Sequence, residues 1–589
     1  MRGHRRHPAW TFLATLAVIA LGPVAPAIAK PPSPVTFTET PLLRPEGYTE
    51  PAVTIGADGR MALAALAVQF DQDYAGGWAG SFGGLPAFVG PLDQDLEASG
   101  ERETFGGSDV DIDIGSTGRL HASTLVARPP SFQLGISNLS CPYSGWLSSF
   151  SGCHRELEDS AGSDRQWITS DGPTVYLAYH DAGASGGIHV IRSDDDGISF
   201  KQAADPIVGS GSITAGATYN NQHGPIVADP RSHNVYISYV SGSPKTKANE
   251  ILHNKVYVAR SGDRGRSWTS SLVFEGPPDV DLGNFWPTLD VDPVTGVLYT
   301  AWTDRHRMMV SQSSDGGRTW STETAVNRAP ATTTVMPWVA AQGGVIDVAY
   351  YGTSGSSPDD RSSVWYVYLA QSRDGGATFQ QTKVSERPNH VGPVCMEGSD
   401  CRAWRQLADL FEVDIDPRSG RVAVTYTTDN LGQPFTVTTG PLSGRQYLSA
   451  EGNFTRPVLV LPDAKLNGPT TYVGPAGCGG PGPPPARGDS DPAVDQIALI
   501  RHTEGCRFDA EAKAVLDAGY EGFVELLAER DDETQMVGAY RDLPGFSVNR
   551  TTAQALLGVS DVAQATVGRA GPSIAVGARR PQVVLAQQT

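Results

Sequence analysis

The sequence predicts a mainly β protein: a β-propeller, with seven blades favoured and six as the alternative, followed by a small α/β domain. A turn pattern of eight residues occurs four times, a longer hairpin pattern occurs seven times, and the composition becomes rich in Gly and Pro after residue 464. Hairpins repeated at intervals of tens of residues are typical of blades that pack around one axis. We expect a signal peptide at residues 1–29, the propeller at 30–464 and the α/β domain at 465–589.

The N-terminal segment predicts export. Arg2, Arg5 and Arg6 precede a short apolar run at 11–25, and the small residues Ala27-Ile28-Ala29 follow it. Positive charge, a short apolar core and a small-residue cleavage site are the features of a signal peptide. The run is short for a membrane span. We therefore expect a secreted, extracellular protein with no membrane span after cleavage.

The net charge of −19 argues against nucleic acid or an anionic membrane as partner, because both require clustered Lys and Arg. Six cysteines in an exported chain suggest three disulfides. Pairing Cys141 with Cys153 and Cys395 with Cys401 would close short loops, which leaves Cys478 for Cys506. Zinc held by these cysteines is the alternative, but no CxxC pair accompanies them.

The turn pattern carries a hydroxyl, a carboxylate, a glycine, a second hydroxyl and an aromatic residue in fixed register. It is SSDGGRTW at residues 313–320, and it returns around Asp195, Asp263 and Asp374. The carboxylate can accept backbone N–H bonds across the turn, and glycine supplies a positive φ. The pattern resembles the Asp-box of sialidase-like (BNR repeat) propellers. This resemblance implies that Asp195, Asp263, Asp315 and Asp374 are structural and lie far from any active site.

The hairpin pattern is clearest at residues 287–305, PTLDVDPVTGVLYTAWTDR, where two alternating apolar runs flank a polar turn. The other copies lie at 51–66, 109–125, 167–181, 225–240, 337–352 and 410–430. Each copy leaves room for a second hairpin, which predicts seven four-stranded blades. Six remains the alternative because sialidases have six. We expect the N-terminal strand PVTFTET to complete the last blade and close the ring.

The segment after residue 464 begins with a broken Gly/Pro-rich stretch and continues in β-α-β order. Strands are expected at 497–502 and 522–527, with a helix at 505–520 between them. This segment resembles the protease-associated (PA) domain: Gly505-Cys506-Arg507-Phe508, Ala518-Gly519 and Leu543-Pro544 occupy the corresponding places. The resemblance implies a non-catalytic module that binds peptides or controls access of substrate.

The strand order places one set of loops on the face where propellers usually bind ligands. These loops enter the first strand or leave the second strand of each blade. Arginines there could hold an anion, and aspartates could supply acids and bases. Loop salt bridges, turn caps and, for the tryptophans, blade core are the alternatives. The ligand-binding candidates are Asp164, Arg165, His223, Trp286, Asp304, Arg305, Trp338, Arg405 and Asp409.

The first blade tests the resemblance to sialidases. That family opens this blade with Tyr/Phe-Arg-Ile-Pro, whose arginine holds the carboxylate of sialic acid. Here the stretch is Tyr48-Thr49-Glu50-Pro51, and the hydroxyl of Thr49 cannot form the bidentate contact of a guanidinium. The family's nucleophilic tyrosine and its glutamate partner cannot be placed, so no catalytic residue is named.

We therefore expect a secreted sialidase-like propeller that recognises an extracellular glycan or protein without sialidase activity. The alternative is a secreted glycoside hydrolase of the same build that acts on a substrate other than sialic acid. No cofactor or metal site is predicted, although the carboxylates of Asp279 and Asp281 are candidates for structural calcium. The sequence does not determine the oligomeric state.

Overall fold

The computed structural model describes residue 1 and most of residues 35–589. The described residues exclude 68–74, 93–104, 129–132, 149, 159–162, 182–186, 207–220, 245–250, 278–281, 283–285, 397–400, 402, 453–454, 480–481, 487–493, 504 and 534–541. The predicted signal peptide and the calcium candidates Asp279 and Asp281 therefore lie outside the described residues, apart from residue 1. Among the described residues, no helix is long and apolar enough to cross a membrane.

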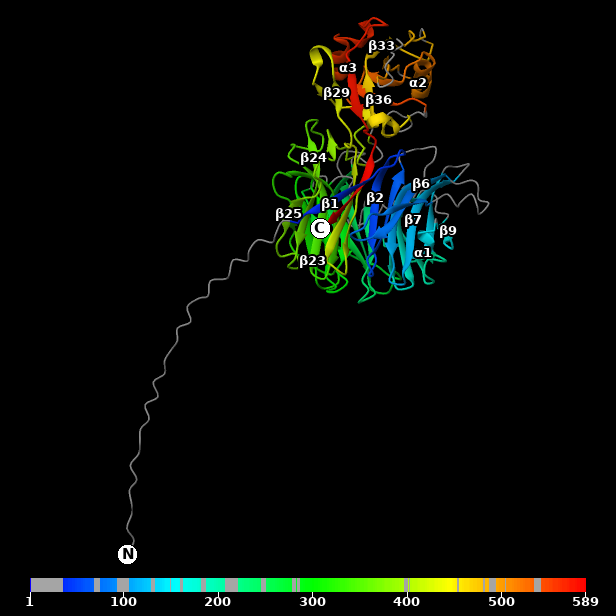
Figure 1. Ribbon diagram of the computed structural model, residues 1–589. Helices are drawn as coiled ribbons and strands as arrows, with labels where there is room; N and C mark the ends of the chain where they lie inside the picture. The colour runs from blue at the N-terminus through cyan, green and yellow to red at the C-terminus, as the bar shows by residue number, and fades with distance from the viewer. Residues whose placement is uncertain are drawn as a thin grey trace. The chain divides into compact units, whose positions relative to one another are not determined.

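Six consecutive antiparallel sheets follow one another along the chain, each with its strands in sequence order (Figure 1). They are β2 (Tyr48–Ile55), β3 (Arg60–Ala67), β4 (Ala75–Ser81), β5 (Ala87–Pro91); β6 (Phe105–Ile114), β7 (Arg119–Arg128), β8 (Gln133–Pro142), β9 (His154–Glu158); β10 (Ser163–Asp171), β11 (Thr174–Asp181), β12 (Ile188–Ser193), β13 (Lys201–Gln202); β14 (Gln222–Ala228), β15 (Val235–Pro244), β16 (Ile251–Ser261), β17 (Thr269–Glu275); β18 (Thr288–Val291), β19 (Leu298–Thr303), β20 (Met308–Ser313), β21 (Thr324–Ala325); and β22 (Thr333–Gln342), β23 (Val345–Thr353), β24 (Val364–Ser372), β25 (Gln380–Lys383). A short helix, α1 (Tyr143–Trp146), follows β8, and β26 (His390–Val391) pairs with β24.

A seventh sheet takes its strands from distant parts of the chain. Its order is β27 (Val413–Asp416), β28 (Arg421–Thr428), β38 (Gln582–Gln588) and β1 (Phe37–Leu42). The N-terminal strand is thus the outer strand of the last sheet, in the place that the sequence predicts. The first strands of successive sheets are neighbours, and β27 lies beside β2, so the seven first strands close a ring.

The part of the chain between β28 and β38 forms two further sheets. A mixed sheet has the order β31 (Ala450–Glu451), β36 (Gly545–Asn549), β35 (Gly522–Leu527), β34 (Ile497–Arg501), β33 (Thr470–Gly474), with the last four strands parallel. A smaller sheet has the order β30 (Gln446–Tyr447), β29 (Phe435–Val437), β37 (Ile574–Gly577), β32 (Lys465–Gly468). The helices α2 (Phe508–Asp517) and α3 (Arg550–Leu557) connect parallel strands or follow them.

The predicted domain boundary between residues 464 and 465 differs from this topology. Strands β29 and β31, which precede the boundary, pair with β37 and β36, which follow it. Strand β38, which was assigned to the α/β domain, pairs with β28 and β1 of the seventh sheet. The small domain is therefore an insertion between the second and third strands of the seventh sheet. Pairing between strands so far apart in sequence leaves no local pattern from which a boundary could be read.

Local sequence explains the ends of α3 and the covalent links. The side chain of Asn549 accepts the backbone N–H of Thr552 at the start of α3, and Gly558 ends the helix in the left-handed conformation. Three disulfides join Cys141 to Cys153, Cys395 to Cys401 and Cys478 to Cys506, which are the pairs that the spacing predicts.

Candidate functional site

The guanidinium of Arg165 is the centre of a buried charged cluster. Its Nη2 donates to Oε2 of Glu50 at 3.0 Å, and its Nε lies 3.4 Å from Oδ2 of Asp109. The guanidinium carbon lies 4.6 Å from the ring centre of Trp286 and 5.3 Å from that of Trp167. Arg165 is 5% exposed and Glu50 2% exposed in their side chains. Two carboxylates and two indole rings thus hold this buried cation.

A second ion pair completes the cluster. Nη2 of Arg405 lies 2.6 Å from Oδ2 of Asp409, and the backbone N–H of Asp409 donates to Oε1 of Glu50 at 3.1 Å. Both residues lie in the segment that leads into β27. Asp164, next to Arg165, is exposed. The acids Glu50, Asp109, Asp164 and Asp409 therefore outnumber Arg165 and Arg405; we call these six residues the Arg165 cluster.

Bulges in the first strands direct these side chains. Glu50 and Arg165 have positive φ values of 49° and 45°, and each lies where the pairing of its strand shifts register. Met336, with φ 53°, occupies the same place in β22. A non-glycine residue in this conformation costs energy and is common at functional sites. The strain therefore marks this end of the first strands as the candidate site.

Burial raises the pKa of Glu50 to about 8. The nearby cation of Arg165 opposes this effect, whereas the carboxylates of Asp109 and Asp409 add to it. The raised pKa brings the titration of the Glu50 carboxyl group close to neutral pH, so this group can exchange a proton there. A carboxyl group with a raised pKa beside other carboxyl groups is an arrangement suited to acid–base chemistry.

Tryptophan rings border the Arg165 cluster. Trp167 is buried, whereas Trp286 and Trp338 are partly exposed, and the ring centre of Trp167 lies 6.2 Å from that of Trp286 and 5.4 Å from that of Trp338. A cavity of ≈ 10 Å³ lies among these three rings and Asp409, with room for about one water molecule. The rings thus form an apolar border beside the charged groups.

The remaining predicted residues have other surroundings. His223 is buried, its ring centre lies 6.3 Å from that of His180, and burial holds its pKa well below the usual value. The carboxylate of Asp304 accepts the backbone N–H groups of His306 and Arg307, so it caps a turn. The backbone N–H of Arg305 donates to Oγ1 of Thr303.

Sequence reasoning missed Glu50 and Asp109, although a signal was present. Glu50 stands directly before the proline that opens the first hairpin copy, as Trp286 and Met336 stand before Pro287 and Pro337. The residue before this proline faces the candidate site in several sheets. The neighbour Thr49 does not take part, because its hydroxyl lies 3.2 Å from that of Thr427 and is buried.

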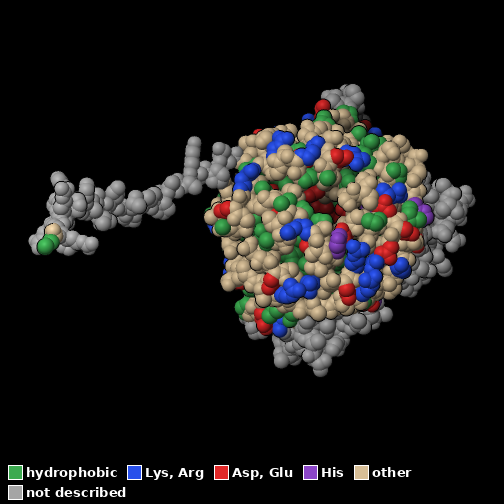
Figure 2. Space-filling view, turned by 90° about the horizontal axis from the view of Figure 1, so that it is seen from below, with side chains coloured by type: hydrophobic (Ala, Val, Ile, Leu, Met, Phe, Trp, Pro, Cys, Tyr) green, Lys and Arg blue, Asp and Glu red, His purple; other side chains and the backbone are tan. Residues whose placement is uncertain are grey.

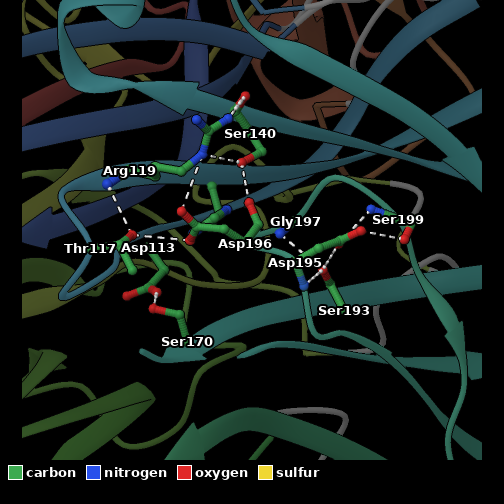
Figure 3. Close-up of polar contacts among 11 residues, drawn as sticks. Asp113, Thr117, Arg119, Ser140, Ser170, Ser193, Asp195, Asp196, Gly197 and Ser199 are labelled. Atoms are coloured by element: carbon green, nitrogen blue, oxygen red, sulfur yellow. Dashed lines mark hydrogen bonds and ion pairs between the residues drawn. The ribbon is translucent and has the colours of Figure 1, made fainter. Parts of the chain in front are cut away.

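The four repeated aspartates bind their own turns, and Figure 3 shows the turn of Asp195. Oδ1 of Asp195 accepts the N–H of Ser199 at 2.9 Å and the hydroxyl of Ser193 at 2.7 Å, and its Oδ2 accepts the hydroxyl of Ser199 at 2.6 Å. Asp263, Asp315 and Asp374 make the same three contacts. The hydroxyl of Ser199 and these other bonds lower the pKa of Asp195 to about 2.

The turn at Asp195 also joins two sheets. Asp196 and Gly197 have consecutive positive φ values of 63° and 77°. The backbone carbonyl of Asp196 accepts the hydroxyl of Ser140, and its carboxylate accepts the hydroxyl of Thr117 and lies 3.6 Å from Nε of Arg119, all in the second sheet (Figure 3). The turn therefore stabilises the contact between neighbouring sheets.

A second group of acids links the first strands. Asp414 accepts the N–H of Ile55, Asp111 that of Ile168, and Asp290 that of Ala341, at 2.6, 2.7 and 2.7 Å. In each case a carboxylate of one first strand bonds a backbone donor of the next. Burial raises the pKa of Asp111 and Asp290 to about 7 and that of Asp414 to about 8. Figure 2 shows acidic side chains in the hollow at the centre of one face.

Comparisons with known proteins show only distant similarity. No protein-family model matches the chain, and no curated protein matches it. A solved α-L-arabinanase from Penicillium chrysogenum in complex with arabinobiose is 13% identical, covers 45% of this chain and 74% of its own, and has a TM-score of 0.31. An ulvan lyase of polysaccharide lyase family PL25 is 11% identical. The match covers 66% of this chain and 93% of the lyase, with a TM-score of 0.40. A Hadza microbial sialidase, Hz136, is 14% identical. The match covers 53% of this chain and 61% of the sialidase, with a TM-score of 0.33.

Proposed function

We propose that the seven sheets are the blades of a seven-bladed propeller and that the four repeated turns are Asp-boxes. The closed ring of first strands supports the first proposal, and the identical bonding of the four aspartates supports the second. We also assign the insertion between β28 and β38 to the PA-like class, on the basis of its β-α-β order and the motif around Cys506. Secretion is supported by the three disulfides.

We propose that the protein recognises an extracellular glycan without a carboxylate at the Arg165 cluster and has no sialidase activity. The observation that carries this proposal is that both arginines already have carboxylate partners within the protein. Arg165 is paired with Glu50 and Asp109, and Arg405 is paired with Asp409. A ligand carboxylate would find both guanidinium groups neutralised and would meet an excess of acids. A neutral or amine-bearing sugar fits this charge better.

The tryptophans support a sugar as the ligand class. Trp286 and Trp338 are partly exposed beside carboxylates that can accept hydroxyl hydrogen bonds. Small-molecule sites typically combine apolar rings with a few polar groups that set orientation. The competing outcome of the test below is that a protein, not a sugar, binds at the Arg165 cluster.

One observation favours a second candidate, a glycoside hydrolase that acts on a substrate other than sialic acid. Glycosidases of most families use one protonated and one ionised carboxyl group on either side of the bond that they cleave. Glu50, with its raised pKa, could be the acid, and Asp109 or Asp409 could be the base. In that case Glu50→Gln would abolish turnover but not binding.

The test is binding of the secreted full-length protein to an array of neutral, amine-bearing and sialylated glycans. We expect binding to a glycan without a carboxylate, and its loss in Trp286→Ala and Asp164→Asn. Asp315→Ala is the matched control: it removes turn bonds, so it should lower the Tm but keep the binding. Release of fluorophore from a methylumbelliferyl sialoside, or binding to sialylated glycans alone, would contradict the proposal.

A further inference from the structure

Three metal-ligating side chains meet in the insertion between β28 and β38. They are His502, directly after β34, Glu511 of α2 and Glu525 of β35; Figure 1 labels α2 in this part of the chain. One ligand atom from each lies within 4.8 Å of the other two. Nδ1 of His502 lies 2.9 Å from Oε2 of Glu511. The three groups come from three elements of one β-α-β unit and converge at the point where α2 packs on the sheet.

A purely structural role does not explain the burial of the Glu525 carboxyl group. Its side chain is fully buried, and neither carboxylate oxygen has a hydrogen-bond partner among the described residues. Glu511, also fully buried, is the neighbouring acid. Apolar residues of the domain core, including Ile500, Ala512 and Val515, lie in the same part of the domain. A buried ionised carboxylate is very costly unless a cation or hydrogen bonds compensate it.

We propose that His502, Glu511 and Glu525 bind one divalent transition-metal ion, for which Zn²⁺ fits best. An imidazole nitrogen with two carboxylate oxygens is a ligand set that Zn²⁺ accepts, whereas Ca²⁺ and Mg²⁺ prefer oxygen ligands alone. Two glutamates also balance the charge of the ion. The site is independent of the ligand proposed for the Arg165 cluster, and it differs from the prediction that the chain has no metal site.

The surroundings of His502 fit an ion with one open position. Its side chain is 20% exposed, so the site has a side that faces solvent. The ring of Phe508 stacks on the imidazole with 4.4 Å between ring centres, which fixes the orientation of His502. Three protein ligands and one water molecule make the four-coordinate arrangement of zinc sites that keep an open position.

The competing state is a metal-free one in which Glu525 is protonated. Burial, together with the Glu511 carboxylate, raises the pKa of Glu525 well above its usual value in the absence of an ion.

The experiment is a titration of the chelator-treated full-length protein with ZnCl₂, followed by calorimetry and metal analysis. We expect one tightly bound zinc per chain. Glu525→Gln and His502→Ala should weaken the affinity by about 100-fold or more, since even indirect supporters of a metal site cost 10- to 100-fold. Glu529→Gln, an exposed acid of the same domain, is the control and should bind like the wild type.

X-ray absorption of the wild-type zinc complex needs no variant and so remains informative if a variant fails to fold. We expect one imidazole nitrogen, carboxylate oxygens and no sulfur around the ion. Absence of zinc binding, unchanged affinity in a folded Glu525→Gln protein, or preference for Ca²⁺ over Zn²⁺ would overturn the proposal.

Discussion

Burial raises the pKa of the Glu50 carboxyl group to about 8. Water cannot solvate the ionised form, and the pairing with Arg165 only partly offsets this loss. The residue also holds two parts of the chain together, through Arg165 of β10 and the backbone of Asp409. At the scale of single residues, Glu50 therefore links two parts of the fold and also offers a titratable group at the candidate site.

Glu50→Gln should reduce the pH dependence of stability. The unfolded glutamate titrates near 4.5 and the folded one near 8. Between these values the unfolded chain has lost the proton that the folded chain keeps, so stability falls as the pH rises through this window. Gln resembles the protonated acid and does not titrate.

Thermal unfolding between about pH 5 and pH 8.5 measures this effect, which is on the order of 4 kcal/mol across the window. Glu386→Gln, an exposed acid, is the control. Equal slopes of Tm against pH in wild type and Glu50→Gln would contradict the assignment.

At the scale of elements, the turn at Asp195 shows that its glycine, Gly197, is required for space as well as for conformation. A Cβ on Gly197 would lie 2.8 Å from Nδ1 of His121, in the second sheet. Gly172, in the turn between β10 and β11, has a similar φ of 61°, and a Cβ there would meet no atom within 4 Å.

Gly172→Ala and Gly197→Ala form a matched pair that separates these two effects. Both substitutions place alanine at positive φ, which costs about 1–2 kcal/mol. Gly197→Ala should cost clearly more, because it also displaces His121 and Ser140. Equilibrium denaturation of both variants gives the comparison. Equal losses would show that the turn does not pack against the second sheet as described.

At the scale of the whole molecule, the two ends of the chain close the ring. Strand β38 lies between β28 and β1, so its removal would leave β1 without a partner and expose the edge of β28. Deletion of residues 582–589 should therefore prevent formation of a soluble, folded protein. A synthetic peptide of those residues, added during refolding, should restore it in part. A folded, monomeric deletion variant, shown by size exclusion and circular dichroism, would contradict this view.

The buried acids of the ring make stability depend on pH throughout the molecule. Burial raises the pKa of Asp111, Asp290 and Asp347 to about 7 and that of Asp414 to about 8. Each contributes stability below its unfolded pKa that is lost as the pH rises towards the folded value. The Tm of the wild type should fall between about pH 4 and pH 8, the interval between the unfolded and the folded pKa values, and Asp290→Asn should make the fall smaller. A Tm that is constant or rises over this range would be inconsistent with these acids being buried in the folded state.

The sequence by itself determined the local chemistry of this protein. The turns around the four aspartates, the hairpins, the β-α-β order and the disulfide pairs could all be predicted, because each depends on residues close together in the chain or on simple spacing. Strand order alone predicted Arg165, Trp286 and Asp409 on one loop face, and in the structure these residues lie close together. For Asp304 the sequence left a turn cap as the alternative, and its carboxylate accepts two backbone N–H groups of its own turn.

Only the tertiary structure decided which of these groups meet. Glu50 pairs with Arg165 across 115 positions and with Asp409 across 359, and these contacts exist because the first strands close a ring. The insertion of the small domain into the seventh sheet was hidden for the same reason, since β38 finds its partners at the other end of the chain. Long-range strand pairing leaves no local signal in the sequence, and the burial that it produces raises the pKa of Glu50 and isolates the carboxylate of Glu525.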